Sequence, residues 1–280
     1  MLNYTQVDNI IKNALNEDIP FYDISTEYLI DDNSHSKVDL ICKENGIISG
    51  IEVFSRVFSI LGDVKVYPLV SDGDFIECGN KIAEIKGNTK KILMGERTAL
   101  NLIQRMSGIA TITNKFVNEI SHTNAKIVDT RKTTPGLRIL EKYAVRTAGA
   151  MNHRFNLSDG IMLKDNHIDA AGGIKKAVNR IRETSSFVRK IEVEVETIDM
   201  VKEALECEID IIMLDNMDLE TASNAVSIIG NKALIEFSGN VSLDNVKNIA
   251  EIGVNYISIG ALTHSAKILD LSMKNLEEIK

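Results

Sequence analysis

The chain has 280 residues, of which 44% are hydrophobic and 26% charged, and it carries a formal net charge of −8 at pH 7. This length allows one large domain or two modest ones, and the acidic balance argues against a nucleic-acid partner, which would require a broad basic face. The three cysteines fit neither a disulfide framework nor a zinc motif, the N-terminus lacks a signal-peptide pattern, and no apolar run could span a membrane, so we expect a cytoplasmic protein with no membrane partner.

The first part of the chain combines helices with a strand-rich region. Apolar residues at helical spacing predict a helix over residues 5–16. Short apolar runs alternate with turns over residues 37–87, which is typical of a small β-rich unit. A longer helix is predicted over 89–120, with an interruption near Ser107-Gly108. Because this part holds few candidate catalytic groups, we expect it to shape or cover a site located elsewhere.

From about residue 125 strands and helices alternate. Near-continuous apolar strands separated by amphipathic helices indicate parallel βαβ units with buried strands. The predicted strands are 126–130, 160–165, 190–196, 210–216, 234–240 and 256–262. This pattern fits an α/β barrel better than an open doubly wound sheet.

Polar residues mark the carboxyl ends of these strands. In α/β barrels the active site lies at these ends and takes residues from several strands. Strand ends are often polar simply because they contact water. One polar strand end therefore does not indicate a site, whereas the whole group of them does. The residues concerned are Asp129, Thr130, Arg131, Lys132, Lys164, Asp165, Asn166, Glu194, Glu196, Asp215, Asn216, Ser238, Gly239, Asn240 and Gly260.

Residues 129–167 concentrate positive charge inside an acidic chain. Arg supplies a planar fork of donors and Lys a mobile charge, so the concentration predicts an anionic small ligand carrying phosphate or carboxylate. The alternative is a solvated, salt-bridged helix face, but several of these residues fall at predicted strand ends and turns.

Alternation in IEVEVE places Glu192, Glu194 and Glu196 on one side of a strand, facing the barrel axis. A carboxylate there is costly unless it is paired, and Lys164 or a divalent cation would satisfy it. The glycine turns at 238–240 and 259–262 suit phosphate binding by backbone N–H groups, although glycine also ends strands for conformational reasons.

Motifs along nearly the whole chain resemble those of the quinolinate phosphoribosyltransferases. They are GERTALNLIQRMSGIAT, DTRKTTPGLRILEKYAV, NHRFNLSDGIMLKDNHI, IEVEVET, IMLDNM, EFSGN and ISIGALTHS. The chain departs from the family pattern at Pro20-Phe21, where a glycine-containing turn is usual, and at Phe237, where a small residue is usual. Neither departure removes a charged site residue.

The resemblance implies an N-terminal α/β sandwich domain over 1–110 and an incomplete α/β (TIM-like) barrel over 111–264, with a C-terminal helix over 265–280 packing back on the first domain. It also implies a pentosyltransferase of NAD biosynthesis, which joins quinolinate to 5-phosphoribosyl-1-pyrophosphate in the presence of Mg²⁺. The products would be nicotinate mononucleotide, pyrophosphate and carbon dioxide.

The resemblance also implies roles for particular residues. The quinolinate carboxylates and the phosphoribosyl donor would be bound by Arg131, Lys132, His153, Arg154 and Lys164, with Thr130 beside them. Glu194 and Asp215 would hold the ribose hydroxyls and, indirectly, Mg²⁺ bound to pyrophosphate. The 5-phosphate would be cradled by Ser238, Gly239, Asn240, Ser258, Ile259 and Gly260.

Two further roles follow from the resemblance. Lys132 is one candidate for the group that protonates the ring carbon after decarboxylation, and the other catalytic residues would be Lys164, Glu194 and Asp215. An arginine on a helix is more often a surface or ion-paired group than a ligand. In this family, however, Arg97 would reach the site of the neighbouring subunit, which implies at least a homodimer.

Three other functions remain open from the sequence. A related phosphoribosyltransferase-like protein, such as one associated with molybdenum transport, would use another acceptor. An aldolase-type barrel would use Lys164 as a Schiff-base amine. A non-catalytic module would bind quinolinate or nucleotides without turnover.

Overall fold

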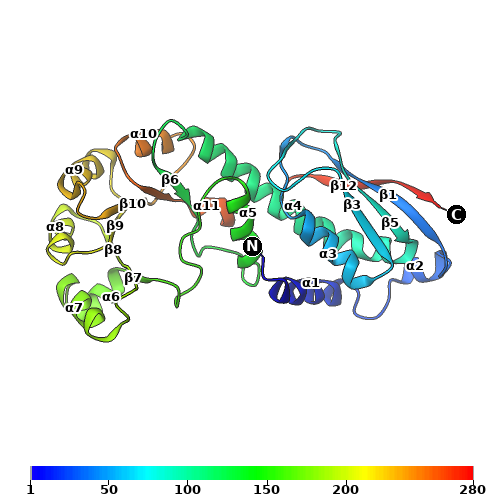
Figure 1. Cartoon of the computed structure of the whole chain (residues 1–280), viewed down its shortest axis with the longest axis horizontal. Coiled ribbons are helices and arrows are strands. Elements are labelled where there is room, and N and C mark those ends of the chain that lie inside the picture. Colours follow the sequence, from blue (N-terminus) through cyan, green and yellow to red (C-terminus); the bar gives the residue numbers. More distant parts are fainter. Residues whose placement is uncertain (1, 280) are drawn as a thin grey trace. The chain divides into compact units, whose positions relative to one another are not determined.

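The computed structural model describes residues 2–279, which form two compact units (Figure 1). The first unit contains the chain up to Asn114, Lys132–Gly149 and the residues from Ala261 onward, and the second contains Lys115–Arg131 and Ala150–Gly260. The chain therefore passes between the units more than once, unlike the continuous ranges 1–110 and 111–264 expected from the sequence. None of the helices in residues 2–279 combines the length and apolarity needed to cross a membrane.

The first unit contains a four-stranded antiparallel sheet with the strand order β12–β1–β5–β3. Its strands are β1 (His35–Cys42), β3 (Val64–Pro68), β5 (Lys81–Asn88) and β12 (Leu271–Glu278), and a separate pair is formed by β2 (Gly46–Ile47) and β4 (Phe75–Ile76). The helices are α1 (Tyr4–Asp18), α2 (Ile24–Leu29), α3 (Ile51–Leu61), most of α4 (Thr89–Glu119), α5 (Arg138–Thr147) and α11 (Ala261–His264).

Apolar faces hold this unit together. Val38, Leu40 and Cys42 alternate along β1 and are buried, because successive side chains of a strand point to opposite faces. On α3, the fully buried rings of Phe54 and Phe58 meet edge to face with centroids 5.2 Å apart.

The expected C-terminal helix over 265–280 is wrong. Residues 271–278 form strand β12, which pairs antiparallel with β1 so that Met273 lies opposite Leu40 and Leu271 opposite Cys42. Leu271 and Met273 are both buried, and the residue between them is half-buried. Pairing with the edge of β1 bonds the backbone of this segment and buries the alternating Leu271 and Met273, so sheet pairing decides its conformation.

The expected interruption of the helix near Ser107-Gly108 is also wrong, because α4 is continuous from Thr89 to Glu119. Gly108 is required for close packing instead. A Cβ atom at this position would lie 1.9 Å from the carbonyl oxygen of Lys267 and 2.9 Å from the Cα of Ile268. The neighbouring segment is hydrogen-bonded to the same helix, since Gln104 donates its side-chain amide to the Leu271 carbonyl at 2.7 Å.

The second unit contains a six-stranded parallel sheet in the order β6–β11–β10–β9–β8–β7. Its strands are β6 (Lys126–Val128), β7 (Ile161–Leu163), β8 (Ile191–Val195), β9 (Ile211–Asp215), β10 (Leu234–Ser238) and β11 (Tyr256–Ser258). The helices that connect them are α6 (Asp165–Ala171), α7 (Ile174–Thr184), α8 (Ile198–Glu206), α9 (Leu219–Ile229) and α10 (Val246–Glu251).

All six predicted strands of this unit are confirmed. Val193, Val195, Ile212 and Leu214 have no exposed surface, as expected for parallel strands covered by helices. Strands β6 and β7 are the two edges of the sheet, and an isolated parallel bridge joins Val128 to Met151. The barrel is therefore incomplete, as the sequence resemblance predicts.

We expect Gly108→Ala to destabilise the protein by about 2–3 kcal/mol, because the new methyl group would collide with backbone atoms of Lys267 and Ile268. Urea unfolding followed by circular dichroism measures the change. Asn101→Ala, on an exposed position of the same helix, is the control and should change the free energy of unfolding by less than about 0.5 kcal/mol. An unchanged stability of Gly108→Ala would contradict the close approach of the C-terminal segment.

Candidate active site

The carboxyl ends of the central strands of the second unit form one polar edge. The parallel register places Asp215 of β9 beside Ser238 of β10, and Ser238 beside Ser258 of β11. Glu194 lies one residue before the end of β8, opposite Met213 of β9. The residues predicted at these strand ends are therefore neighbours across the sheet.

Lys164 and Glu194 form an ion pair at this edge. The Lys164 Nζ donates to Glu194 Oε2 at 2.6 Å, and the two side chains are 44% and 12% exposed. This confirms that Lys164 satisfies the inward-facing Glu194. The Lys164 backbone N–H donates to His167 Nδ1 at 3.1 Å, so the histidine of the LKDNH motif holds the lysine backbone where β7 passes into α6.

His153 lies between two buried glutamates. Its Nε2 is 3.1 Å from Glu192 Oε2 and 3.3 Å from Glu236 Oε2, and the glutamates are only 4% and 3% exposed. Burial lowers the pKa of His153, but the hydrogen bonds and charges of both glutamates raise it, and their effect is the larger. Burial also raises the pKa of Glu192.

These three side chains have the donor types of a metal site. Their ligand atoms lie within 4.8 Å of one another, close enough to share an ion. The sequence pattern predicts that Glu192 faces the barrel axis, but it assigns this residue no partner, and it overlooks Glu236. The available signal for Glu236 is a charged residue in the middle of the apolar run LIEF.

Asp129 anchors the segment that carries His153. It has no exposed surface, its Oδ1 accepts from the His153 backbone N–H at 2.9 Å, and its Oδ2 accepts from the Asn152 side chain at 2.6 Å. The same segment is joined to the sheet by the bridge between Met151 and Val128. A buried carboxylate at the end of β6 therefore fixes the backbone just before Arg154.

Arg131 and Arg154 are electrostatic neighbours. Burial and the positive charge of Arg131 both lower the pKa of Arg154. The Arg154 side chain donates to the Gly160 carbonyl at 3.0 Å, which holds it beside β7. Two guanidinium groups within range of mutual repulsion are stabilised by an anion between them, and they suit a carboxylate or phosphate ligand.

The turn after β10 is formed by residues with left-handed backbone conformations. Gly239 has φ of +98°, and a Cβ atom there would lie 2.2 Å from Asn216 Oδ1, so only glycine fits. Asn216 donates its backbone N–H to the Ser238 carbonyl at 2.9 Å and its side-chain amide to Asp215 Oδ2 at 2.7 Å. The Asn240 side chain in turn donates to Asn216 Oδ1 at 3.3 Å.

A small pocket of about 210 Å³ opens beside this turn, and several of its lining residues carry amide side chains. They are Asn216, Asn240, Asn245 and Asn248, and Gly239 also lines the pocket. The buried Phe237, which departs from the family pattern, also lines it. Asn216 was predicted as a polar strand-end residue without a role of its own, and the structure shows that it connects Asp215 with the turn.

Lys132 belongs to the first unit and lies on an exposed loop that is held by buried groups. The Lys132 carbonyl accepts from Thr263 Oγ1 at 2.7 Å. Further along the same loop, the Thr134 backbone N–H donates to Glu141 Oε2 at 3.1 Å. Glu141 has no exposed surface and is paired with Arg105, whose Nη2 lies 2.9 Å from Glu141 Oε1.

Arg105 is thus an ion-paired residue of helix α4 and not an exposed one. It also donates to the Ala266 carbonyl at 3.1 Å and to the Thr263 carbonyl. One guanidinium group therefore ties together α4, the loop after Lys132 and the start of the C-terminal segment.

Arg97 also belongs to the first unit. It is exposed and lines a pocket of about 510 Å³ together with residues of α1, α4 and the loop at Pro135–Leu137. Apart from Arg97 and Lys132, the predicted site residues belong to the second unit. Among these, the Ile259 backbone N–H donates to the Val128 carbonyl at 3.0 Å, which fixes the chain just before Gly260.

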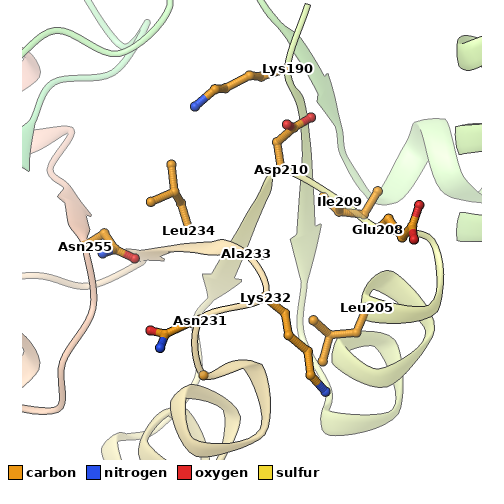
Figure 2. A pocket seen from close by; sticks show the side chains of 11 residues that line it. Lys190, Leu205, Glu208, Ile209, Asp210, Asn231, Lys232, Ala233, Leu234 and Asn255 are labelled. Carbon is orange, nitrogen blue, oxygen red and sulfur yellow. The ribbon is translucent and has the colours of Figure 1, made fainter.

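A larger pocket, of about 760 Å³, lies at the opposite ends of the strands (Figure 2). Its polar groups are used by the sheet: Asp210 Oδ2 accepts from the Ile191 N–H at 2.8 Å, and Asn255 Oδ1 accepts from the Ile235 N–H at 2.7 Å. The amino ends of barrel strands serve stability, and catalysis takes place at the carboxyl ends. The candidate site is therefore the charged edge at the carboxyl ends.

An incomplete parallel α/β barrel with cations, carboxylates and a glycine turn at its strand carboxyl ends defines an α/β-barrel enzyme that acts on anionic substrates. Family models for the N-terminal and C-terminal domains of quinolinate phosphoribosyl transferase match residues 23–107 and 109–274. The chain belongs to the quinolinate phosphoribosyltransferase family.

Individual relatives agree with this assignment. The chain is 42% identical to a probable nicotinate-nucleotide pyrophosphorylase [carboxylating] of Bacillus subtilis, covering 97% of this chain and 94% of the relative. It is 41% identical to a quinolinate phosphoribosyltransferase [decarboxylating] of Nicotiana tabacum, with 95% and 81% covered. The crystal structure of NadC from Streptococcus pyogenes superimposes with a TM-score of 0.96 at 44% identity, covering 100% of this chain and 99% of that one.

We expect Arg105→Ala to destabilise the protein by about 3–5 kcal/mol, because it leaves the fully buried Glu141 without its countercharge. Chemical unfolding measures the loss. The double variant Arg105→Met/Glu141→Leu should recover part of it, since no buried charge remains unpaired. Lys202→Ala, which breaks the exposed pair with Asp199, should cost less than about 0.5 kcal/mol, and an equally small cost for Arg105→Ala would contradict the prediction.

Proposed function

We propose that this protein transfers the phosphoribosyl group of 5-phosphoribosyl-1-pyrophosphate to quinolinate, with loss of the C2 carboxylate as carbon dioxide. The product is nicotinate mononucleotide, a precursor of NAD. The observation that carries the proposal is the arrangement of Arg131, Arg154 and the Lys164–Glu194 pair in the barrel unit of a member of this family. The Bacillus and Nicotiana relatives, named as a probable nicotinate-nucleotide pyrophosphorylase and a quinolinate phosphoribosyltransferase, support the same reaction.

Quinolinate is a dianion, and its two carboxylates require fixed positive partners. The two neighbouring guanidinium groups, Arg131 and Arg154, supply planar donor pairs that match a carboxylate. Lys164 adds a mobile charge at the end of β7, and Lys132 and His153 complete the cationic set. The aldolase alternative is disfavoured because a Schiff-base amine must be open to a substrate carbonyl, whereas Lys164 Nζ is already bonded to Glu194 Oε2 at 2.6 Å.

The phosphoribosyl donor would bind along the adjacent strand ends. Glu194 and Asp215 lie on neighbouring strands, and carboxylate oxygens are the ligands Mg²⁺ prefers. These two residues would hold the ribose hydroxyls and Mg²⁺–pyrophosphate, directly or through water, and Mg²⁺ would offset negative charge on the leaving group. The 5-phosphate would bind at the turn Ser238–Asn240 and at Ser258–Gly260. Thr130 would lie nearby, because it follows β6, the strand that neighbours β11 in the sheet.

The reaction depends mainly on positioning and electrostatics. The bond between ribose C1 and the pyrophosphate oxygen breaks as the pyridine nitrogen attacks C1, and Glu194 or Asp215 stabilises positive charge on the ribose. The positively charged ring nitrogen then accepts the electron pair of the C2–carboxylate bond, and carbon dioxide leaves. The carbanion at C2 is finally protonated, for which Lys132 is one candidate.

The proposal is tested by incubating the pure protein with quinolinate, 5-phosphoribosyl-1-pyrophosphate and Mg²⁺. Nicotinate mononucleotide and carbon dioxide should form in equal amounts, and omission of Mg²⁺ should reduce both. Nicotinic acid, which lacks the C2 carboxylate, serves as the control acceptor. Absence of product with quinolinate over a range of conditions would refute the proposed function.

We expect Lys164→Ala to lower kcat/KM by about 100-fold or more, because it removes a positive charge from the carboxylate site and leaves Glu194 unpaired. Steady-state kinetics with each substrate varied measures the loss. Circular dichroism should show an unchanged fold, since the lysine side chain is 44% exposed. Near-normal activity would remove Lys164 from the site.

We also propose a homodimer, or a higher assembly of dimers, in which Arg97 acts in the neighbouring subunit's site. Its exposed position on α4 is compatible with this role. Arg97→Ala and Lys164→Ala should each be nearly inactive alone. Mixed and refolded together, they should recover about a quarter of wild-type activity if random pairing places one intact site in half of the dimers. Heterodimers without activity would contradict a shared site.

A further inference from the structure

The exposed loop that carries Lys132 is anchored from below by buried side chains. The Lys132 carbonyl accepts from Thr263 Oγ1 at 2.7 Å, and two residues later the Thr134 backbone N–H donates to Glu141 Oε2 at 3.1 Å. Thr263 and Glu141 have no exposed surface. Exposed loops are usually among the more mobile parts of a protein, so two buried anchors within three residues set this loop apart.

The far end of the loop is a tight turn. The Leu137 backbone N–H donates to the Thr134 carbonyl at 3.0 Å, with Pro135 and Gly136 between them, and Gly136 has φ of +83°. Proline at the second position and a left-handed glycine at the third are typical of a type II turn. Proline also fixes its own φ and restricts the residue before it to extended conformations. The chain therefore leaves the anchored segment in a defined direction.

Thr263 is itself held on its other side by Arg105. The Arg105 guanidinium donates to the Thr263 carbonyl and is ion-paired with Glu141, with Nη2 2.9 Å from Oε1. The two anchors of the loop are thus joined through one side chain of α4, and all four residues belong to the first unit. A displacement of Thr263 would disturb a buried ion pair, which makes its hydroxyl a rigid support.

The contact with Thr263 uses the backbone of Lys132 and not its ammonium group. Lys132 directly follows Arg131, within a segment in which positive charges repel one another. A carboxylate bound to the ammonium would hold the lysine but would also neutralise it. A hydroxyl bound to the carbonyl fixes the start of the side chain and adds no negative charge, so the lysine is placed for an anion at a smaller loss of entropy on binding.

We propose that Thr263 is a positioning residue, whose buried hydroxyl fixes the backbone from which Lys132 reaches the substrates. The Arg105–Glu141 pair supports it by holding Thr263 and the rest of the loop in register. The effect on the substrates rests on the proposed function. The hold on the loop is a property of the first unit, and it can be measured without turnover.

Hydrogen exchange followed by mass spectrometry tests the hold on the loop in the full-length protein. In Thr263→Val, which lacks the hydroxyl, amides of residues 132–137 should exchange about tenfold faster than in wild type, because one hydrogen bond that closes the loop is lost. Thr113→Val is the matched control. Thr113 is equally buried on α4, and its hydroxyl has no hydrogen-bond partner within residues 2–279. Unchanged exchange in Thr263→Val would overturn the proposal.

Steady-state kinetics with quinolinate varied tests the consequence for the reaction. Thr263→Val should lower kcat/KM about tenfold, as expected for one net hydrogen bond. Thr263→Ser keeps the hydroxyl and should stay within about threefold of wild type, and Thr113→Val within about twofold. In a Lys132→Ala background, Thr263→Val should have no further effect beyond about twofold, because the two residues act as one unit.

A serine variant as impaired as the valine variant, or equal losses for Thr263→Val and Thr113→Val, would overturn the proposal. So would independent losses for Thr263→Val and Lys132→Ala, which would make Thr263 a purely structural residue. If the wild-type protein forms no product, the proposed function fails, while hydrogen exchange still decides whether Thr263 holds the loop. Hydrogen exchange also decides if Lys132→Ala leaves no activity to compare. Thr263→Ala, which also lacks the hydroxyl, serves if the valine variant does not fold.

Discussion

Pairing of positive side chains with buried or half-buried carboxylates is the constraint on which the structure of this protein depends. Arg105 is paired with Glu141, Lys164 with Glu194, and His153 with Glu192 and Glu236. A buried charge is tolerated only when it is paired and hydrogen-bonded, so each pair fixes the elements that carry it. In an acidic protein this arrangement lets cations collect locally around an anion site without destabilising the chain around them.

The two units hold these pairs in different ways. In the barrel unit the carboxylates project from β8 and β10 of one parallel sheet, and Lys164 follows the neighbouring strand β7. In the first unit Arg105 lies on a long helix and holds a loop and the start of the C-terminal segment. Both arrangements present the motif residues on short connections, while the charges that orient them belong to rigid elements.

Electrostatic preorganisation therefore accounts for most of what the proposed reaction needs. Two anions must approach each other, and the positive charges of Arg131 and Arg154 already act on one another in the protein without substrate. The turn at Gly239 is connected to Asp215 through Asn216, so the proposed phosphate site and the proposed ribose site share one hydrogen-bonded unit. Little proton transfer is required until the last step, which agrees with a site dominated by permanent charges.

The strands and most helices of the barrel unit, the inward-facing Glu194 and its lysine partner were predictable from the sequence, because period-two and helical patterns are local properties of the chain. Other features depended on distant residues. The C-terminal segment became a strand because β1 offered an unpaired edge, and Gly108 served close packing against Lys267 instead of ending a helix. Glu236 was hidden within an apolar run, and the anchoring contacts of Asp129 and Asn216 could not be predicted, because they are made with side chains and backbone groups far away in the sequence. The sequence by itself thus determined the family, the strand order along the chain and the charged strand ends, whereas only tertiary structure decided which charges are paired, since pairing depends on distances between residues far apart in the chain.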